Sequence, residues 1–281
     1  MDVKVMRQRI WSGLIGGAVY LALGWAGGIW LGLGFGLVFL LGLYEFWRLN
    51  LSHGQRLQLF PPAIAGLALL GAVTLGVVGE HGSAAGHGLE PVFAASVVGS
   101  FLATAILEIA NGQCRGATSS AALSVFAGVY TAFPLAYMIL LRGRPGGDSL
   151  YYFFLLTAAI WANDTTAYFA GSAWGRHRLA PAISPKKTYE GAAAGLVGAA
   201  LAGLGLAAAF GRQPWSALVL GVFIGLCGQL GDLFESMLKR DLGVKDSGSF
   251  LPGHGGVLDR FDSLFFAAPL LYYLLSYLVR L

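Results

Sequence analysis

The sequence predicts an all-α protein that crosses a membrane about nine times. Hydrophobic residues make up 56% of the chain and charged residues only 11%, whereas about 25% of residues are charged in soluble domains. The apolar residues also occur in runs of about 20, the length that a helix needs to cross a bilayer. The 42 glycines favour the same fold, because small residues allow helices to pack closely in lipid.

Nine apolar runs are candidate spans. In chain order they are Ile10–Trp25, Gly27–Phe46, Phe60–Val78, Pro91–Ala110, Ser120–Leu141, Leu150–Gly171, Gly191–Phe210, Trp215–Met237 and Arg260–Val279. A glycine-rich turn joins the first two, which could instead form one span and a re-entrant segment. The basic N-terminus precedes no clear signal-peptidase site, so we expect a retained first helix rather than a cleaved signal.

The distribution of Lys and Arg predicts the orientation. With a cytoplasmic N-terminus, 14 of the 18 Lys and Arg residues fall in cytoplasmic segments and 4 in outer segments. Cytoplasmic loops are enriched in these residues, so we expect the N-terminus inside and, with nine helices, the C-terminus outside. Cys114 and Cys227 lie far apart in the sequence and suggest neither a disulfide framework nor a paired-Cys metal motif.

Polar residues divide the chain into two regions. Residues 1–145 are expected to form about five packing or lipid-facing helices with scattered acids, among them Glu45 and Glu108 near helix ends. Residues 146–281 contain the polar motifs WANDTTAY, ISPKKTYEG and GQLGDLFES, followed by a charged stretch. Under the predicted topology all of these motifs lie at or near the cytoplasmic face. We therefore expect a C-terminal catalytic region whose site faces the cytoplasm.

The charged stretch runs from Ser236 to Asp262 and holds 8 of the 32 charged residues of the chain, four of each sign. A loop shaped only by the positive-inside bias would be net basic. Charges beside a bilayer are costly unless they are paired, hydrated or used. The balanced charges therefore favour a functional site.

Acidic side chains in the eighth predicted helix share one face. Asp232, Glu235, Ser236 and Lys239 have the spacing i, i+3, i+4, i+7, which places them on one side of a helix. Acids within a membrane helix are functional by default. The alternative is an internal salt bridge between Lys239 and either acid.

A second acidic group begins the last predicted helix. Asp259 and Asp262 are three residues apart, and a short loop should bring them close to Asp232. Mg²⁺ binds one or two carboxylates and leaves positions for substrate phosphates, so Asp232 and Asp259 are the preferred ligand pair. The alternative is capping, because acids are favoured at a helix N-terminus. Asp164 lies about two turns inside the sixth helix, where an acid also needs a reason.

Basic and glycine residues flank these acids, as they do in phosphoryl-transfer sites. The segment Pro252–Gly256 lets the backbone adopt positive φ and approach an anion; a flexible turn is the alternative. The segment Ser184–Thr188 is basic and carries hydroxyl groups, although positive-inside charge alone could account for it. The residues thus predict a Mg²⁺-dependent membrane enzyme that handles phosphate groups.

The stretch Ser236–Asp262 closely resembles the signature of phosphatidate cytidylyltransferases, also called CDP-diacylglycerol synthases. The matching positions are Ser236, Lys239, Arg240, Lys245, Asp246, Pro252, His254, Gly255, Gly256, Asp259, Arg260 and Asp262. The resemblance extends upstream through GQLGD, ISPKKT, GRHRLAP and the segment Asp164–Tyr168, and covers about Trp161 to the C-terminus. The first 145 residues resemble the family only in being apolar helices.

This resemblance implies that CTP and phosphatidic acid form CDP-diacylglycerol and pyrophosphate at a bacterial-type inner membrane. It implies Mg²⁺, with K⁺ as a possible second, monovalent cation, and a homodimer; no nucleic-acid partner is expected. The phosphate nucleophile has a second pKa of about 6 and is largely dianionic at neutral pH. Charge neutralisation and in-line placement are therefore needed more than a general base.

The site residues follow from the chemistry and the resemblance together. The expected catalytic residues are Asp232, Asp259, Lys239, Arg240, Asp262 and His254. The expected substrate-binding residues are Ser184, Lys186, Lys187, Thr188, Ser236, Lys245, Asp246, Gly255, Gly256 and Arg260. The expected metal ligands are Asp232, Asp259, Asp164 and Glu235.

Two other functions are compatible with parts of this pattern. One is another membrane transferase that acts on a phospholipid or a polyprenyl phosphate. The other, from a different class, is an ion or phosphate transporter in which Asp164 and Asp232 mark a translocation path. Transporters often carry repeats and broken helices in both halves of the chain, whereas the polar residues here are confined to one half and one membrane face. This distribution favours an enzyme.

Overall fold

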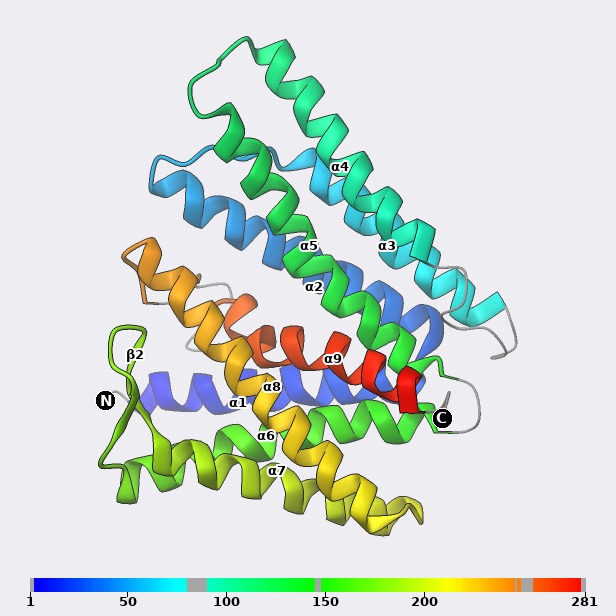
Figure 1. Cartoon of the computed structure of the whole chain (residues 1–281), viewed down its shortest axis with the longest axis vertical. Helices are drawn as coiled ribbons and strands as arrows, with labels where there is room; N and C mark the ends of the chain where they lie inside the picture. The colour runs from blue at the N-terminus through cyan, green and yellow to red at the C-terminus, as the bar shows by residue number, and fades with distance from the viewer. Residues whose placement is uncertain (1–2, 80–89, 145–147, 246, 249–254, 279–281) are drawn as a thin grey trace. The chain divides into compact units, whose positions relative to one another are not determined.

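The computed structural model describes residues 3–79, 90–144, 148–245, 247–248 and 255–278. Within these residues the chain forms nine helices and one two-stranded hairpin (Figure 1). The helices are α1 (Val3–Ala26), α2 (Gly28–Ser52), α3 (Phe60–Gly79), α4 (Glu90–Asn111), α5 (Ala117–Arg142), α6 (Ser149–Trp174), α7 (Tyr189–Phe210), α8 (Pro214–Asp241) and α9 (Leu258–Leu278). The strands are β1 (Arg178–Ala180) and β2 (Ser184–Thr188). The prediction of an all-α protein is confirmed.

Six of these helices are long and apolar enough to cross a membrane, so the protein is a polytopic integral membrane protein. They are α2, α3, α4, α5, α7 and α8. The other three helices at predicted spans are α1, α6 and α9. Polar residues such as Asp164 in α6 and Asp262 in α9 lower the apolar character of the last two. The number of spans therefore remains a prediction.

The first two predicted spans are separate helices. Gly27, between α1 and α2, and Gly28, the first residue of α2, have φ values of 63° and 49°. Residues with a Cβ rarely adopt these angles, which explains the glycine pair at this turn. Arg142, at the end of α5, donates hydrogen bonds to the carbonyl oxygens of Gly24 and Trp25 at 2.7 and 2.9 Å and so fastens the end of α1.

The chain divides into two compact units. The first contains Met1–Gly147 and Asp246–Arg260, and the second contains Asp148–Lys245 and Phe261–Leu281. The division at 147/148 lies close to the predicted boundary at 145/146. Residues 246–260, however, group with the N-terminal helices and not with the C-terminal region in which the sequence places them.

In the first unit, apolar side chains of α2, α3 and α5 form the core. Phe35 and Phe39 of α2, Leu69 of α3, and Leu135 of α5 are at most 1% exposed. Close approach depends on small residues: a Cβ on Gly128 of α5 would lie 3.0 Å from Pro62 of α3.

The second unit is held together by glycines at helix crossings, in keeping with the glycine-rich composition. A Cβ on Gly191 of α7 would lie 2.8 Å from the carbonyl oxygen of Ala167 in α6. A Cβ on Gly221 of α8 would lie 2.5 Å from the carbonyl oxygen of Ala199 in α7. These helices therefore pack backbone against backbone, as small residues permit in membranes.

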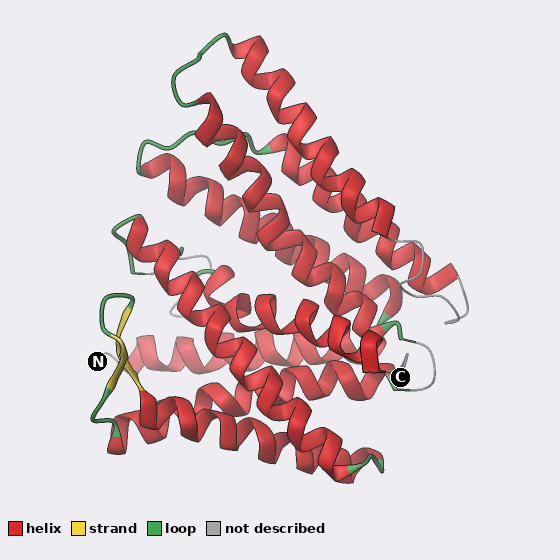
Figure 2. Ribbon diagram, viewed as in Figure 1, coloured by secondary structure: helices red, strands yellow, loops and turns green. Residues whose placement is uncertain are grey.

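The hairpin connects α6 to α7 and pairs β1 with β2 in antiparallel fashion, with Arg178 opposite Thr188 and Ala180 opposite Ser184 (Figure 2). The sequence did not predict these two strands. The strand residues alternate little in polarity, so the pattern that marks a strand is weak. Pairing with β1 fixes the backbone conformation of the basic segment Ser184–Thr188.

Candidate functional site

The site in the second unit centres on Asp232 of α8 and Lys187 of β2. The Lys187 Nζ lies 2.7 Å from the Asp232 Oδ2, and the two side chains are 26% and 33% exposed. Ser236, one turn further along α8, donates a hydrogen bond to the Asp232 Oδ1 at 3.4 Å. The hairpin thus places a cation directly on the acid that the sequence singled out.

Glu235 and Lys239 form an ion pair one turn apart on α8, and their side chains are 3% and 13% exposed. This is the internal salt bridge that remained open as the alternative reading of the sequence. It involves Glu235, whereas the partner of Asp232 comes from the hairpin. The two acids of α8 therefore have different environments.

Asp262 of α9 joins this group. Its carboxylate interacts electrostatically with Asp232, Glu235 and Asp164. The backbone of α9 reaches this position because α8 has a glycine there: a Cβ on Gly231 would lie 2.5 Å from the carbonyl oxygen of Asp262. Three helices of the second unit therefore bring four acidic residues together.

The orientation of Asp164 depends on polar side chains around it. The Asn163 Nδ2 donates to the Asp164 Oδ1 at 3.0 Å. In turn, the Gln229 Nε2 donates to the Asn163 Oδ1 at 2.8 Å and to the carbonyl oxygen of Ala192 at 2.9 Å. Asn163 is 1% exposed, so this network links α6, α7 and α8 in the interior of the unit. Gln229 was not among the predicted site residues, although an amide three residues before an acid in the same apolar helix was a usable signal.

The hairpin and the residues just before it are bonded to α8 and α7. The Arg240 Nε donates to the carbonyl oxygen of Ile183 at 3.2 Å, and its Nη1 donates to the carbonyl oxygen of Val244 at 2.8 Å. An arginine has five N–H donors, so these bonds leave others for a ligand. At the base of the hairpin, Glu190 accepts a hydrogen bond from the Arg176 backbone N–H at 3.1 Å and contacts the His177 Nδ1 at 2.6 Å.

Thr188, a predicted substrate-binding residue, caps α7. Its Oγ1 accepts a hydrogen bond from the Gly191 N–H at 3.1 Å, and the residue is 3% exposed. We expect Thr188→Val to lower the free energy of unfolding by about 1 kcal/mol, because the valine cannot accept this bond. Thr188→Ser keeps the hydroxyl group and serves as the control. Thermal unfolding measures the difference, and equal stability of the two variants would contradict the capping role.

The other predicted substrate-binding residues of the second unit differ in exposure. Lys186 and Lys245 are exposed, Ser184 and Lys187 are half-buried, and Ser236 is 9% exposed. Lys186 and Lys187 alternate along β2, so the structure turns one toward Asp232 and leaves the other in the open. The Lys186 side chain is thus open to a ligand, whereas the Lys187 Nζ is buried against Asp232.

Asp259 lies in the first unit and binds backbone amides. Its carboxylate accepts hydrogen bonds from the Gly256 N–H at 2.8 Å and from the Ser247 N–H at 3.2 Å. Gly255, with φ of 82°, allows the chain to turn back toward Asp259. Asp259 thus caps backbone N–H groups, as the alternative interpretation of the sequence proposed. The neighbouring Arg260 is exposed.

Some predicted relationships remain predictions. Asp246 and His254 lie outside the described residues. Asp259 belongs to the first unit and Asp232 to the second, so their use as one ligand pair is a prediction. Among the described residues, no group of three or more His, Cys, Asp or Glu side chains is already arranged to hold a metal ion. The donor set of the second unit nevertheless consists of carboxylate oxygens, which suit a hard cation such as Mg²⁺.

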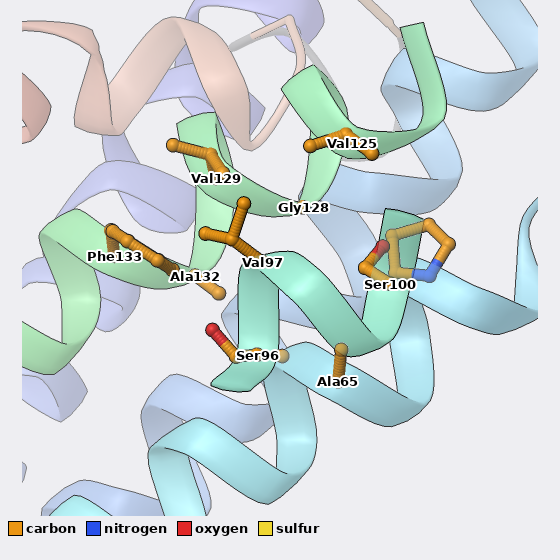
Figure 3. A pocket seen from close by; sticks show the side chains of 11 residues that line it. Ala65, Ser96, Val97, Ser100, Val125, Gly128, Val129, Ala132 and Phe133 are labelled. Atoms are coloured by element: carbon orange, nitrogen blue, oxygen red, sulfur yellow. The ribbon is translucent and has the colours of Figure 1, made fainter. Parts of the chain in front are cut away.

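Two hollows in the first unit differ from this site in chemistry. A cavity of about 10 Å³ lies among α3, α4 and α5 and is lined by residues such as Ala65, Ser100 and Val129 (Figure 3). A space of this volume is about as large as one water molecule. A larger hollow of about 710 Å³ along α4 and α5 is mostly apolar and has Glu108 in its lining. Neither lining contains a Lys or Arg to receive a phosphate.

The chain is similar in sequence to a known family and to several named proteins. The model of a family described as the cytidylyltransferase family matches residues 7–278. Over 146 residues the chain is 47% identical to a phosphatidate cytidylyltransferase from Brucella abortus, over 152 residues 46% identical to one from Bacillus subtilis, and over 122 residues 52% identical to one from Synechocystis. The aligned regions cover 51%, 53% and 42% of this chain. The chain spans about half the length of these curated relatives, at 53%, 56% and 41%.

Proposed function

Because the chain belongs to the cytidylyltransferase family, we propose that it transfers CMP from CTP to phosphatidic acid and forms CDP-diacylglycerol and pyrophosphate. The named relatives are phosphatidate cytidylyltransferases. The observation that carries the proposal is the contact between Lys187 and Asp232. This contact brings together a lysine, which can bind phosphate, and a carboxylate, which can bind a cation, in a membrane protein.

The reaction needs a nucleophile, a leaving group and neutralised charge. An oxygen of the phosphatidate phosphate attacks the α-phosphorus of CTP, and the bond to the β-phosphate breaks as pyrophosphate leaves. The attacking phosphate is largely dianionic, because its second pKa is about 6. Lys187, Lys239 and Arg240 supply positive charge for phosphate oxygens. The acyl chains of phosphatidate remain in the bilayer.

Asp232, Glu235, Asp262 and Asp164 are the residues of the second unit that would hold Mg²⁺. Asp259, in the first unit, stays a ligand predicted from the sequence. Bound there, Mg²⁺ would polarise phosphate oxygens and offset developing negative charge. In the structure Lys187 neutralises Asp232. A lysine displaced from this acid would become available to donate to the phosphates of CTP.

The remaining features of the proposal concern setting. We place the N-terminus and the site at the cytoplasmic face of a bacterial inner membrane, in keeping with the distribution of Lys and Arg. We also propose a homodimer, and K⁺ as a second cation. Crosslinking in intact membranes and a K⁺ titration of turnover test these two features separately.

An assay with purified protein in detergent tests the proposed function. Labelled CTP and phosphatidic acid are supplied with Mg²⁺ or with a chelator, and pyrophosphate and lipid-linked CMP are measured. Mg²⁺-dependent formation of both products is expected. CTP binding without products would indicate another lipid acceptor. The absence of both products and CTP binding would favour a transporter.

Lys187→Met is expected to move two constants in opposite directions. The KM for CTP should rise about 10- to 100-fold, because a charge-assisted bond worth about 1.5–3 kcal/mol is lost. The Mg²⁺ concentration for half-maximal turnover should fall, because the lysine no longer occupies Asp232. Arg212→Met, which removes the partner of Asp148 in the same unit, is the matched control. A rise in both constants would contradict the assignment of Lys187.

A further inference from the structure

Glu45 is a buried acid in a membrane helix. It has no role in the reaction described above. It lies on α2, seven residues before the end of the helix at Ser52, and is 6% exposed. Burial of a carboxylate among apolar helices is costly unless it binds a partner. The partners of Glu45 lie more than 200 residues away in the sequence.

The Glu45 carboxylate accepts a hydrogen bond from the first residue of α9. Its Oε2 accepts a hydrogen bond from the Leu258 N–H at 3.1 Å, across 213 residues of sequence. The Val257 N–H also interacts with this carboxylate. The first N–H groups of a helix have no partner within the helix, so the Glu45 carboxylate supplies an acceptor for the Leu258 N–H.

Two glycines of the stretch Ser236–Asp262 leave room for the Glu45 side chain. A Cβ on Gly248 would lie 2.9 Å from the Glu45 Oε1, and a Cβ on Gly256 would lie 2.7 Å from the Glu45 Oε2 and would also collide with the Ser247 Oγ. Real Cβ atoms essentially never make contacts this short. Glycine at both positions therefore leaves the space that the Glu45 carboxylate occupies.

Glu45 and Asp259 act on the same short segment. Asp259 binds the amides of Ser247 and Gly256, and Glu45 binds the amide of Leu258. Their carboxylates are close enough to interact electrostatically. The conformation in which Asp259 is held thus depends on a side chain from α2.

We propose that Glu45 is a positioning residue, which holds residues 255–259, together with Ser247 and Gly248, in the conformation that presents Asp259 for cation and phosphate binding. This inference rests on the proposed function for its link to turnover. It gives the N-terminal helices, which the sequence predicts to be packing or lipid-facing, a role in positioning Asp259.

The test compares Glu45→Ala, Glu45→Gln and Glu108→Ala in the full-length protein. Glu45→Gln keeps an oxygen that can accept the Leu258 N–H. Glu108 is the matched control, because this acid in the same unit accepts hydrogen bonds from Gln58 and Ser120 at 2.7 and 2.6 Å. The first readout is hydrogen–deuterium exchange of the amides of residues 255–259, and the second is the Mg²⁺ concentration for half-maximal turnover.

We expect Glu45→Ala to speed exchange in this segment and to raise the Mg²⁺ requirement about 10- to 100-fold, the range for residues that orient metal ligands. Glu45→Gln should stay close to the unaltered protein in both readouts, and Glu108→Ala should change neither. Unchanged exchange in Glu45→Ala, or equal changes in Glu45→Ala and Glu108→Ala, would overturn the proposal. If the unaltered protein makes no product, the proposed function fails, while the exchange readout still decides whether Glu45 holds the segment.

Discussion

Asp259→Asn is expected to lower turnover of CTP and phosphatidate by about 10³-fold, because a metal-stabilised transition state is worth several kcal/mol. Its melting temperature should change little. The Asp259 Oδ2 accepts the Gly256 and Ser247 N–H groups at 2.8 and 3.2 Å, and an asparagine oxygen in the same place can accept both. The substitution therefore removes charge while it keeps the capping bonds.

The measurements are pyrophosphate release and thermal unfolding on the same preparations. Asp148→Asn is the control, because Asp148 pairs with Arg212 near the N-terminal ends of α6 and α8, away from Asp164 and Asp232. We expect the control to retain turnover. If Asp259→Asn turned over substrate nearly as fast as the unaltered protein, Asp259 would only cap backbone N–H groups. Its assignment as a metal ligand would then be wrong.

Gly231→Ala is expected to lower turnover about 10²-fold, the cost of small displacements of reacting groups, and to lower the free energy of unfolding by about 1–3 kcal/mol. The added Cβ would lie 2.5 Å from the Asp262 carbonyl oxygen and 3.1 Å from the Phe266 Cβ. A backbone atom cannot rotate away as the end of a side chain can. Here α9 has to move relative to α8, and the move shifts Asp262 relative to Asp232.

Gly205→Ala in α7 is the control for this variant, because its Cβ would meet no atom within 4 Å. Alanine is a better helix former than glycine by about 1 kcal/mol, so the control should be as stable as the unaltered protein or more stable. Turnover and thermal unfolding are measured for both. If Gly231→Ala kept full turnover, the proposed role of the α8–α9 contact in setting the acids would be wrong.

The sequence predicted the helices well because long apolar runs leave the chain few other folds in a membrane. It also identified Asp164, Asp232, Glu235 and Asp262, which the structure brings into electrostatic contact. Acids inside apolar helices are a strong local signal, since their burial needs an explanation. The helical spacing of Asp232 and Glu235 was enough to place them on one side of α8.

Partners across the chain were not predictable in the same way. The sequence offered Lys239 as a partner for both acids of α8, but only a folded hairpin brings Lys187 to Asp232. Likewise, Glu45 was visible only as a scattered acid near a helix end. Its bond to Leu258 spans 213 residues, and neither periodicity nor spacing carries information over that separation.

The grouping of residues 246–260 with the N-terminal helices has a consequence for dissecting the protein. A fragment that starts at residue 146 would contain the whole signature stretch, yet it would lack the carboxylate that receives Leu258 and the surface where Gly42 of α2 closely approaches the same residue. The resemblance of about Trp161 to the C-terminus to the family signature therefore does not define a transplantable module. A chimera that joins this half to foreign N-terminal helices would need an acid at the place of Glu45.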